Sequence, residues 1–313
     1  MENDTNLNTT DEAETYEGAR FTDAKLVRAS LYRFEVTYDP LDAKRSGVTE
    51  ADLATWLEAM IEGWAFNRSS NRTKVDLRHM VVFDAVHQRG AEPAYITDER
   101  VQALCDVVQP EKFDDYTIRV NTDRLPAGMT VHHWAGGQTT TTGDVSKKNL
   151  DPTYGIPLNT NHRKYIVCFV WVEKSNPNGD PQLSGDPRSD ERGFGEISPW
   201  ATKHVIRNYV ERQLGLSVLN SDGGGVSDVT SRQAAFKTAA EAIAGLWDVK
   251  IHGGVLPFFK DRARGCLQVS WATSLHVITV DYKKGVRSIG HMRDVKVKPA
   301  KVKKEKGQPA EAK

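Results

Sequence analysis

The feature that most constrains this fold is a continuous apolar run, "KYIVCFVWVE" at residues 164–173, followed by a polar segment at residues 174–195. A short run rich in Val, Ile and aromatic residues is typical of a strand buried in a sheet. A helix is expected directly after the polar segment, with Ser198 as its N-cap and Pro199 in its first turn. A strand and a helix are usually joined by about five residues. The polar segment, which we call the long joint, is therefore long enough to need a function of its own.

The other predicted strands and helices fall into two groups on either side of a segment without periodicity. Residues 24–134 predict the order β-α-β-α-β-β, with a short helix at 97–109, and residues 163–295 predict β-α-α-β-β, with a helix at 231–247. Residues 135–162 are rich in Gly, Thr, Asn and Pro and predict a linker. Together the two groups predict one α+β domain of the ferredoxin-like or RRM type. In such a domain helices cover one face of the sheet, and we expect the other face to be open to a ligand.

The two ends of the chain carry opposite charge, although the formal net charge of the 313 residues is zero. Residues 1–17 hold six acidic and no basic side chains, whereas residues 296–313 hold seven lysines and two glutamates. Neither end has an apolar period, so residues 1–23 and 296–313 are predicted to be disordered acidic and basic tails. The basic tail is either a solvated terminus or a nonspecific phosphate contact.

The cysteines and the hydropathy indicate in which cellular compartment the protein is expected. Cys105, Cys168 and Cys266 lie far apart, without metal-ligand spacing and in an odd number, which argues against a disulfide framework. No apolar run approaches the ~20 residues of a membrane span. The acidic N-terminal sequence also lacks the apolar stretch of a secretory signal. These observations predict a cytoplasmic protein without a membrane partner.

Acidic side chains in the long joint are the first candidates for metal chemistry: Asp180, Asp186, Asp190 and Glu191. Carboxylates of this kind could hold Mg²⁺. However, each Asp lies beside Gly or Pro or follows Ser, where a carboxylate commonly caps a turn. His132 and His133 alternate across a predicted strand and cannot readily share one ion. We therefore expect no catalytic residue, no metal and no cofactor.

Basic side chains recur at the ends of the predicted elements. On the helix after the long joint, Lys203 and Arg207 are four residues apart, as are His204 and Asn208, so each pair shares a face. A basic face near a helix start suits a phosphate, although a solvated basic face explains the pattern equally well. Further cations stand in other loops, at Arg68, Arg72, Lys74, Lys250, Arg262 and Arg264. The pattern is typical of a track that follows a sugar-phosphate backbone without reading bases.

Several of these stretches form motifs that resemble a known family. "NPNGDP" at 176–181 and "PRSD" at 187–190, followed by "IRNYV" at 206–210 on a helix, resemble the backbone subunit of the type I-C CRISPR surveillance complex (Cascade). That subunit belongs to the RAMP superfamily and coats the guide RNA in antiviral defence. "DVKIHGGV" at 248–255 extends the resemblance, and "GCLQVSWATSL" at 265–275 extends it more loosely.

The N-terminal segment, residues 24–134, is similar to the C-terminal half of the same family. "FNRSSNRTK" stands where the family has "DRSAARG", so Asn67 replaces an aspartate. The chain therefore resembles a circular permutant in which the linker joins the family's end to its start. The new termini would fall between about Arg287 and Leu26, within the segment that forms the family's thumb. Permutation is tolerated where the original termini are close and the new cut is exposed.

The resemblance implies a non-enzymatic subunit with an RRM-like palm and inserted finger and thumb segments. It implies binding to guide RNA (crRNA), head-to-tail assembly with copies of itself, contact with other effector subunits, and presentation of the RNA for pairing with target nucleic acid. Lys250 and His252 stand where the family has Arg and Phe. Lys250 keeps the positive charge but lacks the planar, bidentate guanidinium of arginine. The predicted RNA-binding residues are Asn176, Asn178, Arg188, Lys203, His204, Arg207, Asn208, Lys250, His252, Gly253, Arg262, Arg264, Arg68, Ser70, Arg72 and Lys74.

Two other functions stay open at this point. Relatives in the same superfamily cut target RNA with an aspartate of the thumb, and Asp281 or Asp294 would take that role in a metal-dependent endonuclease. Alternatively, a solitary homologue would sequester guide RNA as an interaction protein. The sequence offers no acidic cluster to support the endonuclease, which therefore ranks well below the RNA-coating function. The residues do not separate the solitary homologue from the effector subunit, nor a DNA target from an RNA target.

Overall fold

The computed structural model describes residues 19–86, 96–143, 149–183, 185–221 and 229–288. Most of them belong to one compact unit, Lys25–Lys283; the second unit, residues 1–24 and 284–313, is described only where two strands extend into it. The predicted basic tail and residues 1–18 of the predicted acidic tail lie outside the described residues. The rest of the acidic tail begins the first strand.

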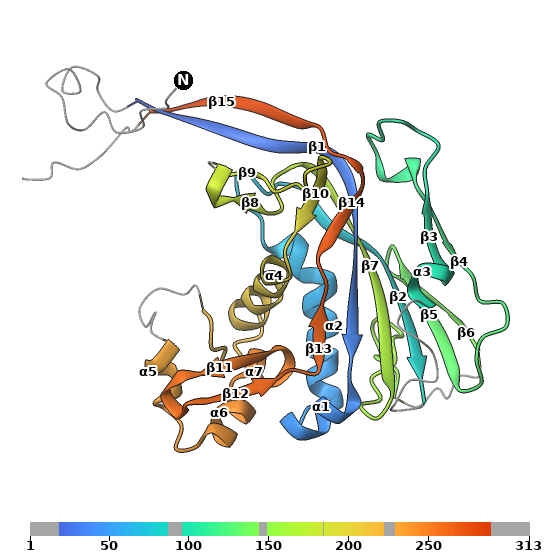
Figure 1. Ribbon diagram of the computed structural model, residues 1–313, viewed down its shortest axis with the longest axis vertical. Coiled ribbons are helices and arrows are strands. Elements are labelled where there is room, and N and C mark those ends of the chain that lie inside the picture. Colours follow the sequence, from blue (N-terminus) through green and yellow to red (C-terminus); the bar gives the residue numbers. More distant parts are fainter. Residues whose placement is uncertain (1–18, 87–95, 144–148, 184, 222–228, 289–313) are drawn as a thin grey trace, which may run out of the picture. The chain divides into compact units, whose positions relative to one another are not determined.

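An antiparallel sheet forms the centre of the larger unit, with the strand order β10-β14-β1-β7-β2-β5-β6 and with β13 and β15 also paired to β1 (Figure 1). Its strands are β1 (Ala19–Tyr38), β2 (Val75–Ala85), β5 (Met129–Ala135), β6 (Gln138–Thr142), β7 (Arg163–Ser175), β10 (Phe194–Ile197), β13 (Leu267–Val269), β14 (Ala272–Val277) and β15 (Val280–Ser288). The apolar run lies in β7 and is buried from Lys164 to Val172, which confirms the predicted buried strand.

Helices cover one face of this sheet. α2 (Glu50–Phe66) begins with a capping box, in which the Thr49 hydroxyl accepts from the amide of Asp52 at 3.2 Å and the Asp52 carboxylate accepts from the amide of Thr49 at 2.8 Å. α4 (Pro199–Arg212) packs on α2 (Figure 1). Gly63 makes this close packing possible, because a Cβ there would lie 3.3 Å from a methyl group of Val205. The predicted N-caps Thr49 and Ser198 are both confirmed.

The opposite face of the sheet is also covered, and the expectation of an open face was wrong. Leu31, Phe83 and Phe169 on the central strands are buried there with Val101 and Tyr116. Val101 begins β3 (Val101–Leu104), and Tyr116 directly precedes β4 (Thr117–Val120), which pairs with β3. These segments have little periodicity, so the sequence did not reveal that they pack on the sheet.

Three local predictions also change. The helix expected at 97–109 is only α3 (Ile96–Arg100), which continues into β3. Residues 138–142 of the expected linker form β6 on the sheet edge. The helix expected at 231–247 is broken from Ala234 to Thr238, where Thr238 caps the next helix, and again at Leu246. The resulting short helices are α5 (Val229–Gln233), α6 (Ala239–Gly245) and α7 (Trp247–His252).

The remaining elements lie outside the central sheet. They include α1 (Pro40–Ser46), the hairpin β8 (Gly179–Asp180) and β9 (Asp186–Pro187) in the long joint, and the hairpin β11 (Gly253–Leu256) and β12 (Asp261–Arg264). Mixed helices and a large antiparallel sheet confirm the α+β class. In the described part of the chain, no helix is both long enough and apolar enough to cross a membrane.

Candidate nucleic-acid interface

The cations of α4 form the centre of the candidate interface. Lys203 and Arg207 are half-buried one helical turn apart. Burial lowers the pKa of the Lys203 ammonium, and the nearby charge of Arg207 lowers it further. Two like charges that are partly removed from water repel each other, and an anion bound beside them would relieve that repulsion. This pair is therefore the strongest anion-binding candidate among the predicted residues.

His252, at the end of α7, lies close to these two cations but inside the protein. Burial lowers its pKa to about 3, and the charges of Lys203 and Arg207 contribute. Its Nδ1 is 3.4 Å from the carbonyl oxygen of Leu267. The imidazole is thus neutral, and its buried position gives it a role in packing rather than in direct contact with a ligand.

Two polar residues next to these cations on α4, His204 and Asn208, help to hold two helices together. The amide nitrogen of Asn208 is 3.0 Å from Nε2 of His204 and donates to Oδ1 of Asn67 at 3.2 Å. Asn67 in turn donates to the carbonyl oxygen of Val205 at 3.4 Å. Asn208 is buried, so it connects α4 to the end of α2 and is not exposed to a ligand.

The first asparagines of the long joint are buried and shape the backbone. The side-chain amide of Asn176 donates to the carbonyl oxygen of Gly185 at 2.8 Å. Oδ1 of Asn178 accepts from the hydroxyl of Ser198 at 3.1 Å, and this hydroxyl also caps α4. Asn178 therefore positions the start of the helix that carries Lys203.

The aspartates of the long joint form turns and ion pairs. Asp180 accepts from the amide of Gln182 at 2.9 Å, and Asp190 accepts from the amides of Arg192 and Phe194, each at 2.9 Å. Asp186 forms an ion pair with Lys25. These contacts agree with the interpretation of the aspartates as turn formers. Across the described ranges, no group of three or more His, Cys, Asp or Glu side chains gathers in a way that could hold a metal ion.

The loop that follows α2 lies against the long joint. Nε of Arg72 donates to the carbonyl oxygen of Asn176 at 3.3 Å, and the amide of Asn176 donates to the carbonyl oxygen of Asn71 at 2.6 Å. Arg68 and Ser70 are exposed in this loop, whereas Lys74 pairs with Glu173 at 2.5 Å. The structure thus brings together three stretches that the sequence placed far apart: this loop, the long joint and α4.

Most of the basic residues around α7 are neutralised by acidic partners. Lys250 lies 2.6 Å from Asp52, the carboxylate of the α2 capping box, and Arg264 lies 3.0 Å from Asp42. Gly253 has a φ of 77°, and a Cβ there would lie 2.5 Å from the amide nitrogen of Gly265, so tight backbone packing explains this glycine. Arg262 is exposed on β12. This group contributes less free positive charge than the sequence suggested.

Of the two candidate nuclease aspartates, Asp281 and Asp294, only Asp281 lies in the described part of the chain. The carboxylate of Asp281 accepts from Nη2 of Arg28 at 2.8 Å and from Nε at 3.2 Å. These hydrogen bonds and the positive charge lower its pKa. Asp294 lies outside the described residues.

Sequence reasoning missed two exposed tryptophans beside the interface. Trp200 in the first turn of α4 is 70% exposed, and Trp271, between β13 and β14, is 41% exposed. One signal was available: Trp200 falls outside the apolar stripe of Ala201, Val205 and Tyr209. An apolar residue on the polar side of an amphipathic helix is a candidate for contact with a partner.

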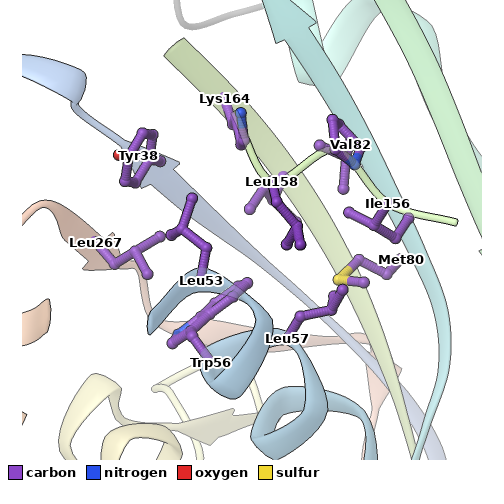
Figure 2. Close-up of a pocket in the computed structure, with 12 residues that line it drawn as sticks. Tyr38, Leu53, Trp56, Leu57, Met80, Val82, Ile156, Leu158, Lys164 and Leu267 are labelled. Carbon is purple, nitrogen blue, oxygen red and sulfur yellow. The ribbon is translucent and has the colours of Figure 1, made fainter. Parts of the chain in front are cut away.

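Two cavities of the larger unit lie away from the α4 cations. An apolar cavity of about 20 Å³ lies between α2 and the sheet. Figure 2 shows Trp56, Met80 and Leu158 in its wall. That volume accommodates one water molecule, and its apolar lining offers such a water little hydrogen bonding. A larger hollow of about 620 Å³ is lined by Asp84, His132 and His162. Neither contains the cations of α4.

Comparison with protein families identifies the chain. The model of the family described as CRISPR-associated protein Cas7 matches residues 2–121 and 162–308. These segments cover most of the sequence, so the chain belongs to the CRISPR-associated protein Cas7 family. Searches of curated proteins and of solved structures found no match. The family confirms the resemblance seen in the sequence motifs at this coarser level.

Proposed function

We propose that the protein is a guide-RNA-binding backbone subunit of a CRISPR effector complex of the type I-C kind. The observation that carries the proposal is the pair of Lys203 and Arg207 on α4, next to the long joint, in a chain of the Cas7 family. Two neighbouring cations on one side of a helix suit the phosphates of an RNA backbone. Copies would assemble head to tail along the RNA, with other subunits of the effector, and present the RNA to its target.

We also propose that the chain is a circular permutant with an RRM-like palm. The gap in the family match, residues 122–161, contains almost all of the predicted linker. Thr142, the last residue of β6, and Arg163, the first residue after the linker, lie at the same end of the sheet: Arg163 pairs with Ala85, Ala85 with Met129, and Thr142 with the nearby Val131. Original termini that close together would allow permutation without distortion of the sheet.

The third part of the proposal is that the subunit does not cut RNA. Its support is the engagement of Asp281 with Arg28, which occupies the carboxylate that a metal ion would need. Target RNA paired with bound guide and incubated with Mg²⁺ should stay intact. Cleavage that is lost in an Asp281→Asn variant would show that the protein is an endonuclease.

The test of RNA binding is a salt titration with single-stranded RNA. Wild-type protein should bind RNAs of unrelated sequence with similar affinity, and Lys203→Gln with Arg207→Gln should reduce the slope of log K against log salt concentration by about 1.4, or about 0.7 for each lost phosphate contact. A matched control is Lys112→Gln with Arg119→Gln, which changes two exposed cations near β4. No binding by the wild-type protein at low salt, or equal slopes for the two double variants, would contradict the proposal.

A further inference from the structure

Two tryptophans form an exposed aromatic pair at the start of α4. The ring centroids of Trp200 and Trp271 are 6.1 Å apart, with an interplanar angle of 77°. Trp200 is 70% exposed and Trp271 is 41% exposed. Large aromatic side chains are normally buried for most of their surface, so an adjacent exposed pair indicates a surface that meets a partner.

The surroundings of this pair are basic. The guanidinium of Arg188 lies 5.8 Å from the ring centroid of Trp271, and Nη2 of Arg188 is 3.5 Å from the carboxylate of Asp180. Lys203 follows Trp200 by three residues and Arg207 follows by seven, so the three side chains lie along the same side of α4. One aromatic residue and two cations thus form a continuous stripe on the helix surface.

The pair is not needed for the core of α4. The buried side of that helix is formed by Val205, Ile206 and Val210, which pack on α2 and the sheet. Trp200 lies outside this cluster, and so does Trp271. Smaller or polar residues would serve equally well at both positions if folding were their only role.

We propose that Trp200 and Trp271 stack against an unpaired base of the RNA whose phosphates lie on Lys203 and Arg207. This inference rests on the proposed function and adds a nonionic, base-contacting site to it. A positively charged groove combined with aromatic side chains is how proteins hold single-stranded nucleic acid without reading its sequence. The positive charge beside the pair favours a polyanion over an apolar protein partner.

The experiment measures the affinity of full-length variants for an oligouridylate and for the same oligomer with abasic ribose. Trp200→Ala with Trp271→Ala should weaken oligouridylate binding about 10- to 100-fold and leave the salt slope unchanged, since stacking releases no counterions. The paired Phe substitutions should restore most of the affinity. Wild-type protein should bind the abasic oligomer more weakly, and the Ala variant should not distinguish the two oligomers.

The matched control is Phe258→Ala, which removes another exposed aromatic residue, 48% exposed and next to β11. Its affinity for the oligouridylate should equal that of the wild type, and thermal unfolding should show that every variant is folded. If wild-type protein binds RNA with the expected salt slope but the Trp variants bind equally well, the stacking site is wrong and the proposed function stands. If those variants instead lose only the association with another subunit, the pair is a protein interface. If wild-type protein does not bind RNA, both proposals fail.

Discussion

A buried ion pair joins the two segments that flank the linker, and its removal is the most informative stability test. Lys164 on β7 lies directly opposite Asp84 on β2, with 2.6 Å between Nζ and Oδ1. The two side chains are 4% and 8% exposed. Nζ of Lys164 also donates to the carbonyl oxygen of Asn159 at 2.8 Å, and Nδ1 of His162 is 2.7 Å from the other oxygen of Asp84.

The magnitude follows from this geometry. Burial alone would raise the pKa of Asp84, but the hydrogen bond from His162 and the charge and hydrogen bond of Lys164 outweigh it, so its pKa is lowered. Lys164→Met leaves the buried carboxylate with one partner instead of two. Removal of one member of a buried pair destabilises a protein by about 3–5 kcal/mol, and we expect about 3 kcal/mol because the contact of His162 with Asp84 remains.

The assay is urea unfolding at neutral pH, followed by circular dichroism and analysed by linear extrapolation. Asp84→Asn should destabilise the protein by a similar amount. The double variant should lose about 2 kcal/mol less unfolding free energy than the sum of the two single losses, because it removes the charge left unpaired in each single variant. Strictly additive losses, or a loss below about 1 kcal/mol for Lys164→Met, would refute the claim that the pair joins β2 and β7 in a low-dielectric environment.

Three further predictions concern pH, chain order and capping. Burial lowers the pKa of His132 to about 4, so the folded protein binds fewer protons than the unfolded chain between pH about 6.5 and 4. The free energy of unfolding should therefore fall as the pH drops through that window. His132→Asn should reduce the slope of this free energy against pH by up to about 1.4 kcal/mol per pH unit. An unchanged slope in urea unfolding experiments at several pH values would count against the burial of this imidazole. A re-permuted chain, opened between Gly143 and Asn149 with its present ends joined by a flexible linker, should fold to the same circular dichroism spectrum, whereas an unfolded product would argue against the permutation. Thr49→Ala should destabilise the protein by about 1 kcal/mol through loss of the α2 cap, whereas Thr49→Ser should be nearly neutral in the same unfolding assay.

The elements that the sequence predicted well are those with local signals. The caps Thr49 and Ser198 and the apolar run of β7 depend on neighbouring residues alone, and the structure confirms them. The covered second face could not be predicted, because Val101 and Tyr116 pack on it from short segments without periodicity. Their burial depends on contacts that are distant in the sequence.

The candidate interface likewise contains features that local sequence patterns indicate and features that depend on contacts distant in the sequence. Charge patterns singled out Lys203 and Arg207 as candidates, but they also included Lys250 and Arg264, whose acidic partners Asp52 and Asp42 are remote in the sequence. Pairing of that kind is visible only in three dimensions. Trp200 was missed for the opposite reason, since an isolated apolar residue at a helix start is ambiguous until its exposure is known.

The central claim is that this chain coats guide RNA as a multi-copy subunit. The most direct measurement is the mass and nucleic-acid content of the full chain co-expressed with guide RNAs of two lengths, purified at low salt and examined by native mass spectrometry. The account predicts complexes with several copies of the chain on one RNA, and more copies on the longer RNA. An RNA-free monomer, or a fixed stoichiometry that does not change with RNA length, would contradict it.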